Sequence, residues 1–327
     1  MRHAPRESVP GVAAWVRAHG CAVSTALLDP ACRHFFVPGV PGVIGYREGW
    51  GCAVGLGDPV CPPEQTGALV DAFGDFCHAR DAGAVFAVAS PALTALCVAR
   101  GWAAIEFGVE LILDPRRDPQ SGARGRELRK KVNRAKKAGV TVHEHHLGDP
   151  LVERAMEQCA LSWLGARRGP QIYLARVRLF ADPLGKRWFY ALFGERIVGV
   201  LSMMRLDARD GWLLDHLIAT PDAPGGTTER LAAHALGVLG AEGCRFATFG
   251  PAPSAELGRV VGLGPVAEAL ARGIYETVGR VFHLDARVRY RKKFQVERTE
   301  ASSLVFSRGL GLRELTGVLR AFNVSLG

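Results

Sequence analysis

The pattern of apolar and polar positions is clearest between residues 211 and 242. An apolar run at 212–219 has the length of a buried strand, and it ends at the turn-forming sequence Pro-Asp-Ala-Pro-Gly-Gly of 221–226. Apolar residues then recur at helical spacing, at Leu231, Ala235, Leu236 and Leu239. The pattern predicts a strand, a glycine-rich turn and a helix in immediate succession.

Two polar residues, Asp215 and His216, interrupt this apolar strand. A carboxylate in a buried strand is costly unless it has a partner or faces a cavity. We therefore take Asp215 as a candidate catalytic acid or base with His216 beside it. The alternatives are that Asp215 holds the α-ammonium of an aminoacyl group, or that it forms a structural salt bridge to His216 or Arg205. Because side chains alternate along a strand, we expect Asp215 and His216 on opposite faces, so that both cannot line one cavity.

The turn after the strand is a candidate anion site. Gly225, Gly226 and Thr227 lead into the helix, whose first N–H groups and positive dipole end favour a phosphate. An ordinary strand-to-helix turn is the commoner explanation of the same residues. The sequence leaves both open.

The first half of the chain repeats this order of elements. Strand patterns between 43 and 56 lead into a Gly-Asp-Pro turn at 57–59, a helical pattern at 64–80 and a strand at 84–89. One supersecondary unit used twice explains the repetition. Antiparallel strands followed by a turn, a helix and a further strand are the layout of the GNAT acyltransferase fold. We predict an α/β protein of two tandem GNAT domains with mixed, largely antiparallel central sheets.

The repeat also suggests the domain boundaries. A segment rich in Pro, Arg, Asp and Gly at 114–125 is the predicted linker between a domain at 1–113 and a domain at 126–327. The first turn carries Asp58, whose carboxylate would repel a phosphate. We therefore expect a supporting first domain and a catalytic second domain.

Composition narrows the class of protein. The 327 residues are 48% hydrophobic and 22% charged, as in a globular protein. No apolar run reaches the roughly 18 residues of a spanning helix, and residues 1–30 do not read as a signal peptide, so we expect a cytoplasmic protein. Eight cysteines without a Cys-x-x-Cys pair predict reduced, buried thiols and no structural zinc.

The net charge of +9 favours polyanionic partners: RNA, anionic lipid or a phosphorylated cofactor. Two segments concentrate the charge, a predicted basic helix at 126–138 and a run of basic and aromatic residues at 287–294. An RNA contact and a solvent-exposed basic face explain each segment about equally well.

Several short motifs follow one another along nearly the whole chain: Gly57-Asp58-Pro59-Val60, the basic stretch 128–135, Trp163-Leu164-Gly165, Asp215 with 221–226, Gly250-Pro251-Ala252-Pro253 and Tyr290-Arg291-Lys292-Lys293-Phe294. In their shared order and spacing they resemble the catalytic domain of the aminoacyl-tRNA-dependent phosphatidylglycerol lysyltransferases. The resemblance implies a tandem GNAT fold.

The chain departs from that family at named positions. His216-Leu217-Ile218 follows Asp215 where the family has Leu-Met-Arg, and Thr248 stands at a position that is typically asparagine. Thr299-Glu300-Ala301 keeps only the glutamate of a Trp-Glu-Pro-Arg-Tyr segment, and the family's membrane-spanning half has no counterpart here. The amino acid and the acceptor therefore stay open.

These patterns and the resemblance together give the candidate site. The predicted catalytic residues are Asp215 and His216. The predicted substrate-binding residues are Trp163, Thr248, Gly250, Pro251 and Ser254. The predicted contacts to tRNA or phosphate are Gly225, Gly226, Thr227, Arg129, Lys130, Arg134, Arg291, Lys292 and Lys293. A core position for Trp163 and a plain loop at 250–253 are the alternatives.

His143, His145 and His146 look like a metal cluster, but no cysteine or carboxylate pattern completes it. We expect surface histidines and no metal. The amphipathic tail at 304–326 has two interpretations: contact with an anionic membrane, or docking on the domain.

The resulting hypothesis is an aminoacyltransferase that moves an aminoacyl group from tRNA to a hydroxyl, amine or hydroxylamine of a lipid or small metabolite. The ester is already activated, so no cofactor is expected beyond aminoacyl-tRNA as co-substrate. The alternatives are an N-acyltransferase that uses a CoA thioester, and a non-catalytic module that binds RNA or membrane.

Overall fold

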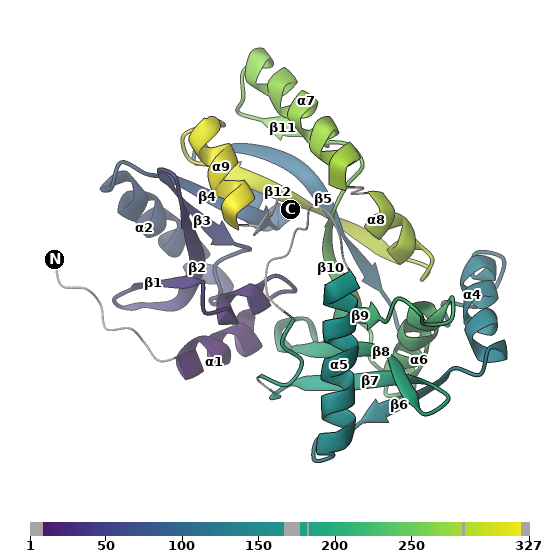
Figure 1. The fold of residues 1–327 in the computed structure, drawn as a ribbon. Coiled ribbons are helices and arrows are strands. Elements are labelled where there is room, and N and C mark those ends of the chain that lie inside the picture. Colours follow the sequence, from purple (N-terminus) through teal and green to yellow (C-terminus); the bar gives the residue numbers. More distant parts are fainter. Residues whose placement is uncertain (1–8, 167–176, 182, 283–284, 322–327) are drawn as a thin grey trace.

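The computed structural model describes residues 9–166, 177–181, 183–282 and 285–321 (Figure 1). Its strands form one mixed sheet in the order β1-β2-β3-β4-β12-β5-β10-β9-β8-β7-β6, with β11 paired to β5. The strands are β1 (Arg33–Val37), β2 (Val40–Gly49), β3 (Cys52–Leu56), β4 (Gly83–Ala89), β5 (Ala103–Leu113), β6 (Thr141–His145), β7 (Lys186–Phe193), β8 (Arg196–Leu206), β9 (Gly211–Ala219), β10 (Ala247–Pro253), β11 (Val260–Val261) and β12 (Arg298–Phe306).

The sheet contains the predicted unit twice. In each half an antiparallel meander ends in a strand that pairs in parallel with the strand after the next helix: β3 with β4, and β9 with β10. The other strand pairs of the described residues are antiparallel. The predicted α/β fold, with tandem GNAT-like units and mixed, largely antiparallel sheets, is confirmed.

The two units share their sheet. β5 pairs with β10, which joins the halves, and β12 lies between β4 and β5. A division at 114–125 therefore leaves β12 inside the sheet of the first segment, and the two-residue strand β11 also pairs with β5. This crossing ties the two halves together through strand pairing.

Helices cover the sheet, and their ends follow local sequence signals. Ser90 caps the helix at Pro91–Val98, where its hydroxyl accepts a hydrogen bond from the Leu93 N–H at 3.1 Å. The α-helices are α1 (Val9–His19), α2 (Thr66–His78), α3 (Pro91–Val98), α4 (Arg126–Lys137), α5 (Pro150–Ala166), α6 (Thr227–Ala241), α7 (Pro265–Phe282), α8 (Asp285–Lys292) and α9 (Leu312–Ala321).

The C-terminal tail is docked on the first half as far as it is described. α9 packs on β2 and β3 and buries Val318 and Ala321. Gly317 lets it approach closely, because a Cβ there would lie 2.0 Å from the Cys52 sulfur. Docking, the second of the two interpretations, accounts for residues up to 321; residues 322–326 lie outside the described part.

In the first half, a side chain connects the parallel strands β3 and β4 just beyond their last paired residues. Leu56 pairs with Ala87, and the Asp58 carboxylate then accepts a hydrogen bond from the Ser90 N–H at 2.8 Å. Val88 between them has a φ of +64°, a strained value for a β-branched residue. Asp58 thus fills the gap between the diverging strands, which fits a supporting rather than a catalytic first unit.

Asp58→Asn should stabilise the protein at neutral pH. Burial raises the pKa of Asp58, so the folded state favours the protonated carboxyl, and ionisation above that pKa costs stability. Asparagine keeps an acceptor for the Ser90 N–H and removes the charge. The gain in unfolding free energy should shrink as the pH falls to about 4, the ordinary aspartate pKa.

The control for this change is Asp58→Ala. Alanine leaves the Ser90 N–H without its partner, so this variant should be less stable than wild type at every pH. Denaturant unfolding of both variants between pH 4 and pH 8 provides the measurement. An Asp58→Asn variant that is less stable than wild type at pH 7 would contradict this account.

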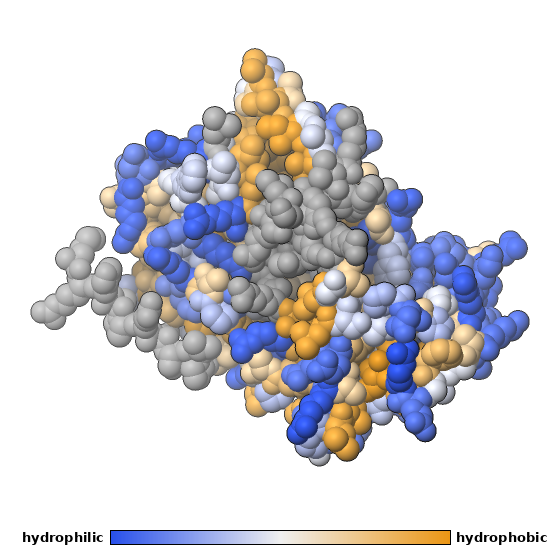
Figure 2. Space-filling model, viewed as in Figure 1, coloured by the Kyte–Doolittle hydropathy of each residue, from blue (hydrophilic) through white to orange (hydrophobic). Residues whose placement is uncertain are grey.

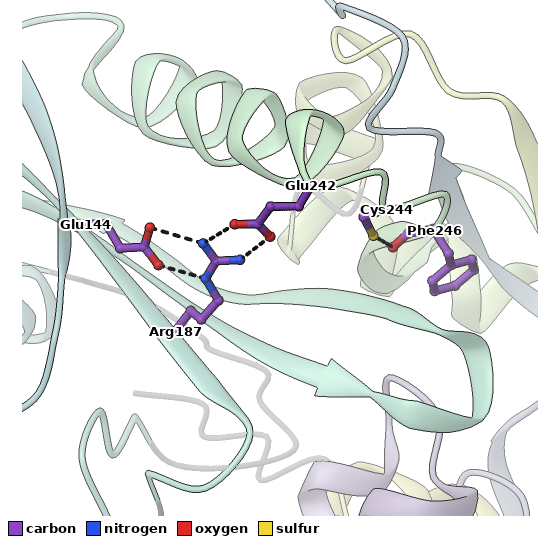
Figure 3. A network of polar contacts seen from close by, with 5 residues as sticks. All are labelled: Glu144, Arg187, Glu242, Cys244 and Phe246. Carbon is purple, nitrogen blue, oxygen red and sulfur yellow. Dashed lines mark hydrogen bonds and ion pairs between the residues drawn. The ribbon is translucent and has the colours of Figure 1, made fainter.

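An ion-pair network fixes the far end of α6 (Figure 3). The Arg187 guanidinium on β7 contacts both oxygens of Glu144 on β6, at 2.7 and 3.0 Å, and both oxygens of Glu242 at the end of α6, at 2.6 and 2.9 Å. The hydrogen bonds to Glu144, and then those to Glu242, raise the pKa of Arg187. The network therefore holds α6 against the sheet at the end away from the glycine turn.

The eight cysteines are free thiols, six of them buried. Burial raises the pKa of Cys32, Cys77 and Cys97 to about 12, and that of Cys52 and Cys159 to about 11. These thiols stay protonated and unreactive at neutral pH.

Candidate active site

Asp215 lies in a β-bulge. Ser202 of β8 pairs with His216, and the next residue, Met203, pairs with Leu214, so Asp215 is an extra residue in β9. Asp215 Oδ2 lies 2.7 Å from His216 Nδ1. The prediction that alternation places these two side chains on opposite faces was wrong, because one inserted residue breaks the period of the strand. The described lining of the pocket beside them includes Asp215 and not His216, as expected if both cannot line one cavity.

Ser202 contacts the same histidine. Its hydroxyl oxygen lies 3.3 Å from His216 Nδ1, and the residue is 2% exposed. A nucleophilic triad uses the two ring nitrogens for two different partners, whereas Ser202 and Asp215 here share one nitrogen. Ser202 therefore orients the imidazole.

A pocket of about 360 Å³ opens where β9 and β10 diverge. Their parallel pairing consists of Trp212 with Ala247 and Leu213 with Thr248, and the pocket lies beyond it. α8 packs against β10 (Figure 1) and contributes several residues to the lining of the pocket. The described residues that line the pocket are Leu214, Asp215, Leu217, Thr228, Phe249, Ala286, Arg287, Tyr290 and Arg291.

The pocket lining combines polar side chains from two elements with apolar side chains. Asp215 lies on β9, and Arg287 and Arg291 lie on α8. The Arg291 guanidinium donates to the Gly250 carbonyl at 2.6 Å. Burial, and then the nearby Arg287, lower the pKa of Arg291 to about 10, so it remains cationic at neutral pH. This arrangement suits a ligand with an ammonium group at one end and an anionic or carbonyl oxygen at the other.

Tyr290 supplies a neutral hydrogen-bond donor beside the arginines. Burial, and then the Glu229 carboxylate, raise the pKa of Tyr290 well above its ordinary value, so the hydroxyl stays protonated. The Lys293 ammonium lies 5.2 Å from the ring centroid. The sequence analysis placed Tyr290 in a basic run and in a motif of the family resemblance but gave it no role in the site, and it missed the contribution of Thr228, Leu217 and Phe249 to the pocket.

The glycine turn is shaped by helix packing. Gly226 has a φ of +98°, and a Cβ there would lie 2.1 Å from the Lys131 carbonyl oxygen of α4. The Thr227 hydroxyl donates to the Pro224 carbonyl at 2.6 Å. A Cβ on Gly225 would lie 3.1 Å from the guanidinium carbon of Arg134. The turn thus lets α4 and α6 approach each other closely.

A carboxylate already occupies the positive end of α6. Glu229, in the first turn, is 6% exposed, and its carboxylate lies 3.1 Å from the Thr228 hydroxyl and 3.3 Å from the Lys293 ammonium. An anionic ligand at this helix end would meet that negative charge.

The predicted substrate-binding residues lie outside the pocket lining. Thr248 is fully buried; its hydroxyl donates to the Leu111 carbonyl at 3.3 Å and accepts from the Gly250 N–H at 2.9 Å. Pro251 pairs with β5, and the Ser254 N–H donates to the Phe107 carbonyl at 2.8 Å. Gly250, at a φ of +73°, holds Arg291 through its carbonyl. Residues 250–253 belong to β10 and not to an irregular loop.

Trp163 is half-buried and packs at the edge of the core, which is nearer to the alternative interpretation. It lies on α5 and packs on an apolar cluster that contains Met156, Trp188 and Ile218. It is absent from the described lining of the pocket.

Of the basic residues that were predicted to contact phosphate, some are exposed and others bond to neighbouring parts of the protein. Arg129 donates to the Gln120 and Gly122 carbonyls and orders the segment before α4. Lys130 and Arg134 are exposed on α4, and Lys292 is exposed at the end of α8. Lys293 lies 3.3 Å from both Glu127 and Glu229, so it joins α4, α6 and the end of α8.

The three histidines at 143–146 lie on or just after the edge strand β6. His143 and His146 are exposed, as predicted, but His145 is 6% exposed and lies 3.3 Å from Glu153, so its predicted surface position was wrong. Within the described ranges, no group of three or more His, Cys, Asp or Glu side chains could hold a metal ion. In the same ranges, the helices fall short of the length and hydrophobicity that a bilayer-spanning segment requires.

Comparisons with known proteins agree with this fold. The family model for the C-terminal region of phosphatidylglycerol lysyltransferase matches residues 18–306. The lysylphosphatidylglycerol biosynthesis bifunctional protein LysX of Mycobacterium bovis is 32% identical over 266 residues, 78% of this chain. LysX of Mycolicibacterium vanbaalenii is 29% identical over 274 residues, 80% of this chain. The chain spans only 22% and 24% of these two proteins, respectively.

Two solved structures share the fold over almost the whole chain. The C-terminal domain of a putative lysylphosphatidylglycerol synthetase from Agrobacterium fabrum has a TM-score of 0.79 at 18% identity, and covers 97% of this chain and 96% of its own. L-PGS from Bacillus licheniformis has a TM-score of 0.79 at 19% identity and covers 98% of both chains. With the family model spanning both GNAT-like units and the pocket between β9 and β10, the chain belongs to the phosphatidylglycerol lysyltransferase C-terminal family.

Proposed function

We propose that this protein is an aminoacyltransferase that moves an aminoacyl group from tRNA to a hydroxyl group of a membrane lipid, with phosphatidylglycerol as the first candidate. The observation that carries the proposal is the pocket in which Asp215, held by His216, faces Arg287 and Arg291. Family membership and the names of the relatives support the same reaction class.

The chemistry needs little beyond positioning. The acceptor hydroxyl attacks the carbonyl carbon of the aminoacyl ester, a new C–O bond forms, and the bond to the tRNA oxygen breaks. The pair of Asp215 and His216 takes the acceptor proton, which then passes to the leaving tRNA hydroxyl. Arg287 and the Tyr290 hydroxyl stabilise negative charge on the carbonyl oxygen. No electrons change hands, so the proposed reaction uses aminoacyl-tRNA as co-substrate and no further cofactor.

A CoA thioester as donor is the weaker candidate. A GNAT-type pyrophosphate site would use the N-terminus of α6, where Glu229 is buried in the first turn. Gly226 is packed against the Lys131 carbonyl. The missing side chain at Gly226 therefore makes room for α4 and not for a ligand. Both observations favour an aminoacyl ester entering the pocket between β9 and α8.

The basic face of α4 is the proposed contact for the tRNA backbone. Lys130, Arg134, Lys136 and Lys137 are exposed on it, and α4 packs against α6, whose first turn lines the pocket. Figure 2 shows hydrophilic surface over this part of the molecule, at the right of the view.

Replacing Lys130 and Lys137 by alanine should weaken tRNA binding and flatten its dependence on salt. Each lost phosphate contact should reduce the slope of log K against log salt by about 0.7–0.9. The measurement is tRNA affinity over a series of salt concentrations. Arg33→Ala with Arg320→Ala removes the same charge from exposed positions of the first half and should leave the slope unchanged. Equal slopes for wild type and the α4 variant would place the RNA elsewhere.

The proposed membrane contact is α7. Val266 is 84% exposed and Leu270 is 61% exposed, one helical turn apart, and Figure 2 shows this apolar surface at the top of the molecule. Tyr275 anchors the helix through hydrogen bonds to the Phe107 and Ser254 carbonyls at 2.6 and 2.8 Å. α7 precedes α8, which contributes to the pocket lining, so a peripheral contact here would hold the catalytic half of the molecule at the membrane surface.

The decisive experiment incubates the protein with a tRNA pool carrying labelled amino acids and with phosphatidylglycerol vesicles. Label that moves into the organic phase supports the proposal. Label that leaves tRNA only when a small hydroxyl or amine compound is added identifies a small-metabolite acceptor. No loss of label from any charged tRNA, with either acceptor class, overturns the proposal.

A further inference from the structure

Thr228 connects the pocket to a buried carboxylate. It lines the pocket and lies in the first turn of α6. Its hydroxyl donates a hydrogen bond to Oε2 of Glu229 at 3.1 Å, whereas the Lys293 ammonium lies 3.3 Å from the other oxygen, Oε1. A hydroxyl has one proton to donate and two lone pairs that accept. Because its proton is directed to Glu229, the Thr228 oxygen serves a ligand as a hydrogen-bond acceptor.

A second hydroxyl in the pocket has a hydrogen bond to give. The Tyr290 hydroxyl oxygen is buried, and no atom of the described residues has the geometry of a hydrogen bond to it. Burial and Glu229 raise the pKa of Tyr290 and Thr228 opposes them, so the two hydroxyls are neighbours. A buried hydroxyl without a partner is costly, and here its proton stays in place at neutral pH. Tyr290 therefore offers a donor beside the acceptor of Thr228.

This acceptor and this donor match two adjacent groups of an aminoacyl ester. The α-ammonium group only donates hydrogen bonds, the carbonyl oxygen only accepts them, and the α-carbon joins the two groups. The proposed reaction already directs the carbonyl oxygen to Tyr290 and uses Asp215 as the base for the acceptor hydroxyl. The α-ammonium group then falls to Thr228, so that each polar group of the reacting molecules has its own side chain.

The charge of Glu229 favours an ammonium group at this position. Glu229 is 6% exposed, so water screens its charge only weakly. Lys293 shares its own charge between Glu229 and Glu127, which also lies 3.3 Å away. Hydrogen bonds with an ionised partner are about twice as strong as those between neutral groups. A cationic donor at Thr228 therefore gains more from the carboxylate behind the hydroxyl than a neutral donor does.

We propose that Thr228, polarised by Glu229, binds the α-ammonium group of the aminoacyl ester, so that the pocket selects esters with a free amino group over hydroxyacyl and N-acylated esters. The inference rests on the proposed function, since it assigns the amino group of the same donor within the same pocket. It concerns the group that aminoacyl esters share and is independent of the amino-acid side chain.

The test compares the binding of two adenosine derivatives to the full chain. The 3′-alanylamido and 3′-lactylamido compounds resist transfer, and they differ only in carrying an ammonium group or a hydroxyl on the same carbon. Alanine has a small side chain, so both compounds fit a pocket that accepts a larger one. Wild type should bind the alanylamido compound more tightly by about tenfold. This comparison needs no variant.

Three variants assign the preference to Thr228. Thr228→Val keeps the shape, removes the acceptor and should bring the two affinities within about twofold of each other. Thr228→Ser keeps the hydroxyl and should retain the preference. Thr94→Val is the matched control, because the Thr94 hydroxyl donates to the Ser90 carbonyl at 2.7 Å at the start of α3, outside the described pocket lining. It should bind both compounds as wild type does.

The outcomes separate this inference from the proposed function. Equal affinities in wild type, no binding of either compound, or a ratio of affinities that Thr228→Val leaves unchanged overturn the inference. Transfer from charged tRNA to lipid then still upholds the proposed reaction. A ratio that Asp215→Asn abolishes and Thr228→Val preserves moves the ammonium group to Asp215 and also overturns it. A preference that depends on Thr228 without any transfer upholds the selection and contradicts the proposed reaction.

Discussion

Asp215→Asn should lower the rate of aminoacyl transfer by about two to four orders of magnitude with little change in melting temperature. The carboxylate lines the pocket and lies 2.7 Å from His216 Nδ1 in a β-bulge of β9. Asparagine keeps the shape and removes the charge that takes the proton. Single-turnover kinetics with aminoacyl-tRNA, together with thermal unfolding, provide the measurement.

The control is Asp222→Asn. Asp222 is an exposed acid just after β9, and its carboxylate forms a surface ion pair with Arg196 at 2.6 Å. Its loss should leave transfer within about twofold, since surface pairs contribute little. If Asp215→Asn instead weakens donor binding with a small change in the chemical step, the carboxylate holds the α-ammonium group. Full activity with unchanged melting would remove Asp215 from the site.

Gly226→Ala should destabilise the protein by about 2–4 kcal/mol. Gly226 has a φ of +98°, and the added Cβ would lie 2.1 Å from the Lys131 carbonyl oxygen, so α4 and α6 must separate. The movement displaces Thr228 from the pocket, and transfer should fall with stability. Denaturant unfolding monitored by fluorescence gives the free energy.

Gly237→Ala is the matched control for this change. Gly237 lies in the same helix, and an added Cβ would meet nothing within 4 Å. Alanine in a helix interior is favoured over glycine by about 0.5–1 kcal/mol, so this variant should be more stable than wild type. The two substitutions are chemically identical and should have opposite signs. Destabilisation of equal size in both would mean that α6 tolerates no alanine for reasons unrelated to α4.

Local patterns in the sequence were reliable where neighbours along the chain decide the structure. The basic helix was predicted at 126–138 and lies at Arg126–Lys137, and the Ser90 cap forms its hydrogen bond to Leu93. The strand predicted at 212–219 lies at Gly211–Ala219. Hydrophobic period, capping residues and glycine stops act within a few residues, so a single sequence carries them.

The position of a side chain was harder to predict where one inserted residue, or one contact with a distant segment, decides which way the side chain points. The basic run at 287–294 was compatible with an exposed strand. Residues 287–292 belong instead to α8 and residues 293–294 to the turn after it, where Tyr290 and Phe294 both pack on the core of the second half. Lys293 was predicted to bind phosphate and instead lies between Glu127 and Glu229. Thr248 was predicted to bind substrate and is buried between β5 and the Gly250 backbone.

Residue patterns alone were enough to predict the repeated α/β unit, to single out Asp215 and to establish the basic character of the chain, because these follow from period, turn chemistry and composition. Three-dimensional packing was needed to learn that Asp215 meets His216 at a bulge, and that α8 brings Arg287, Tyr290 and Arg291 opposite it. Packing was also needed to learn that α4 lies against the glycine turn. Register, helix approach and pocket walls depend on contacts between segments tens of residues apart, and no local pattern records such contacts.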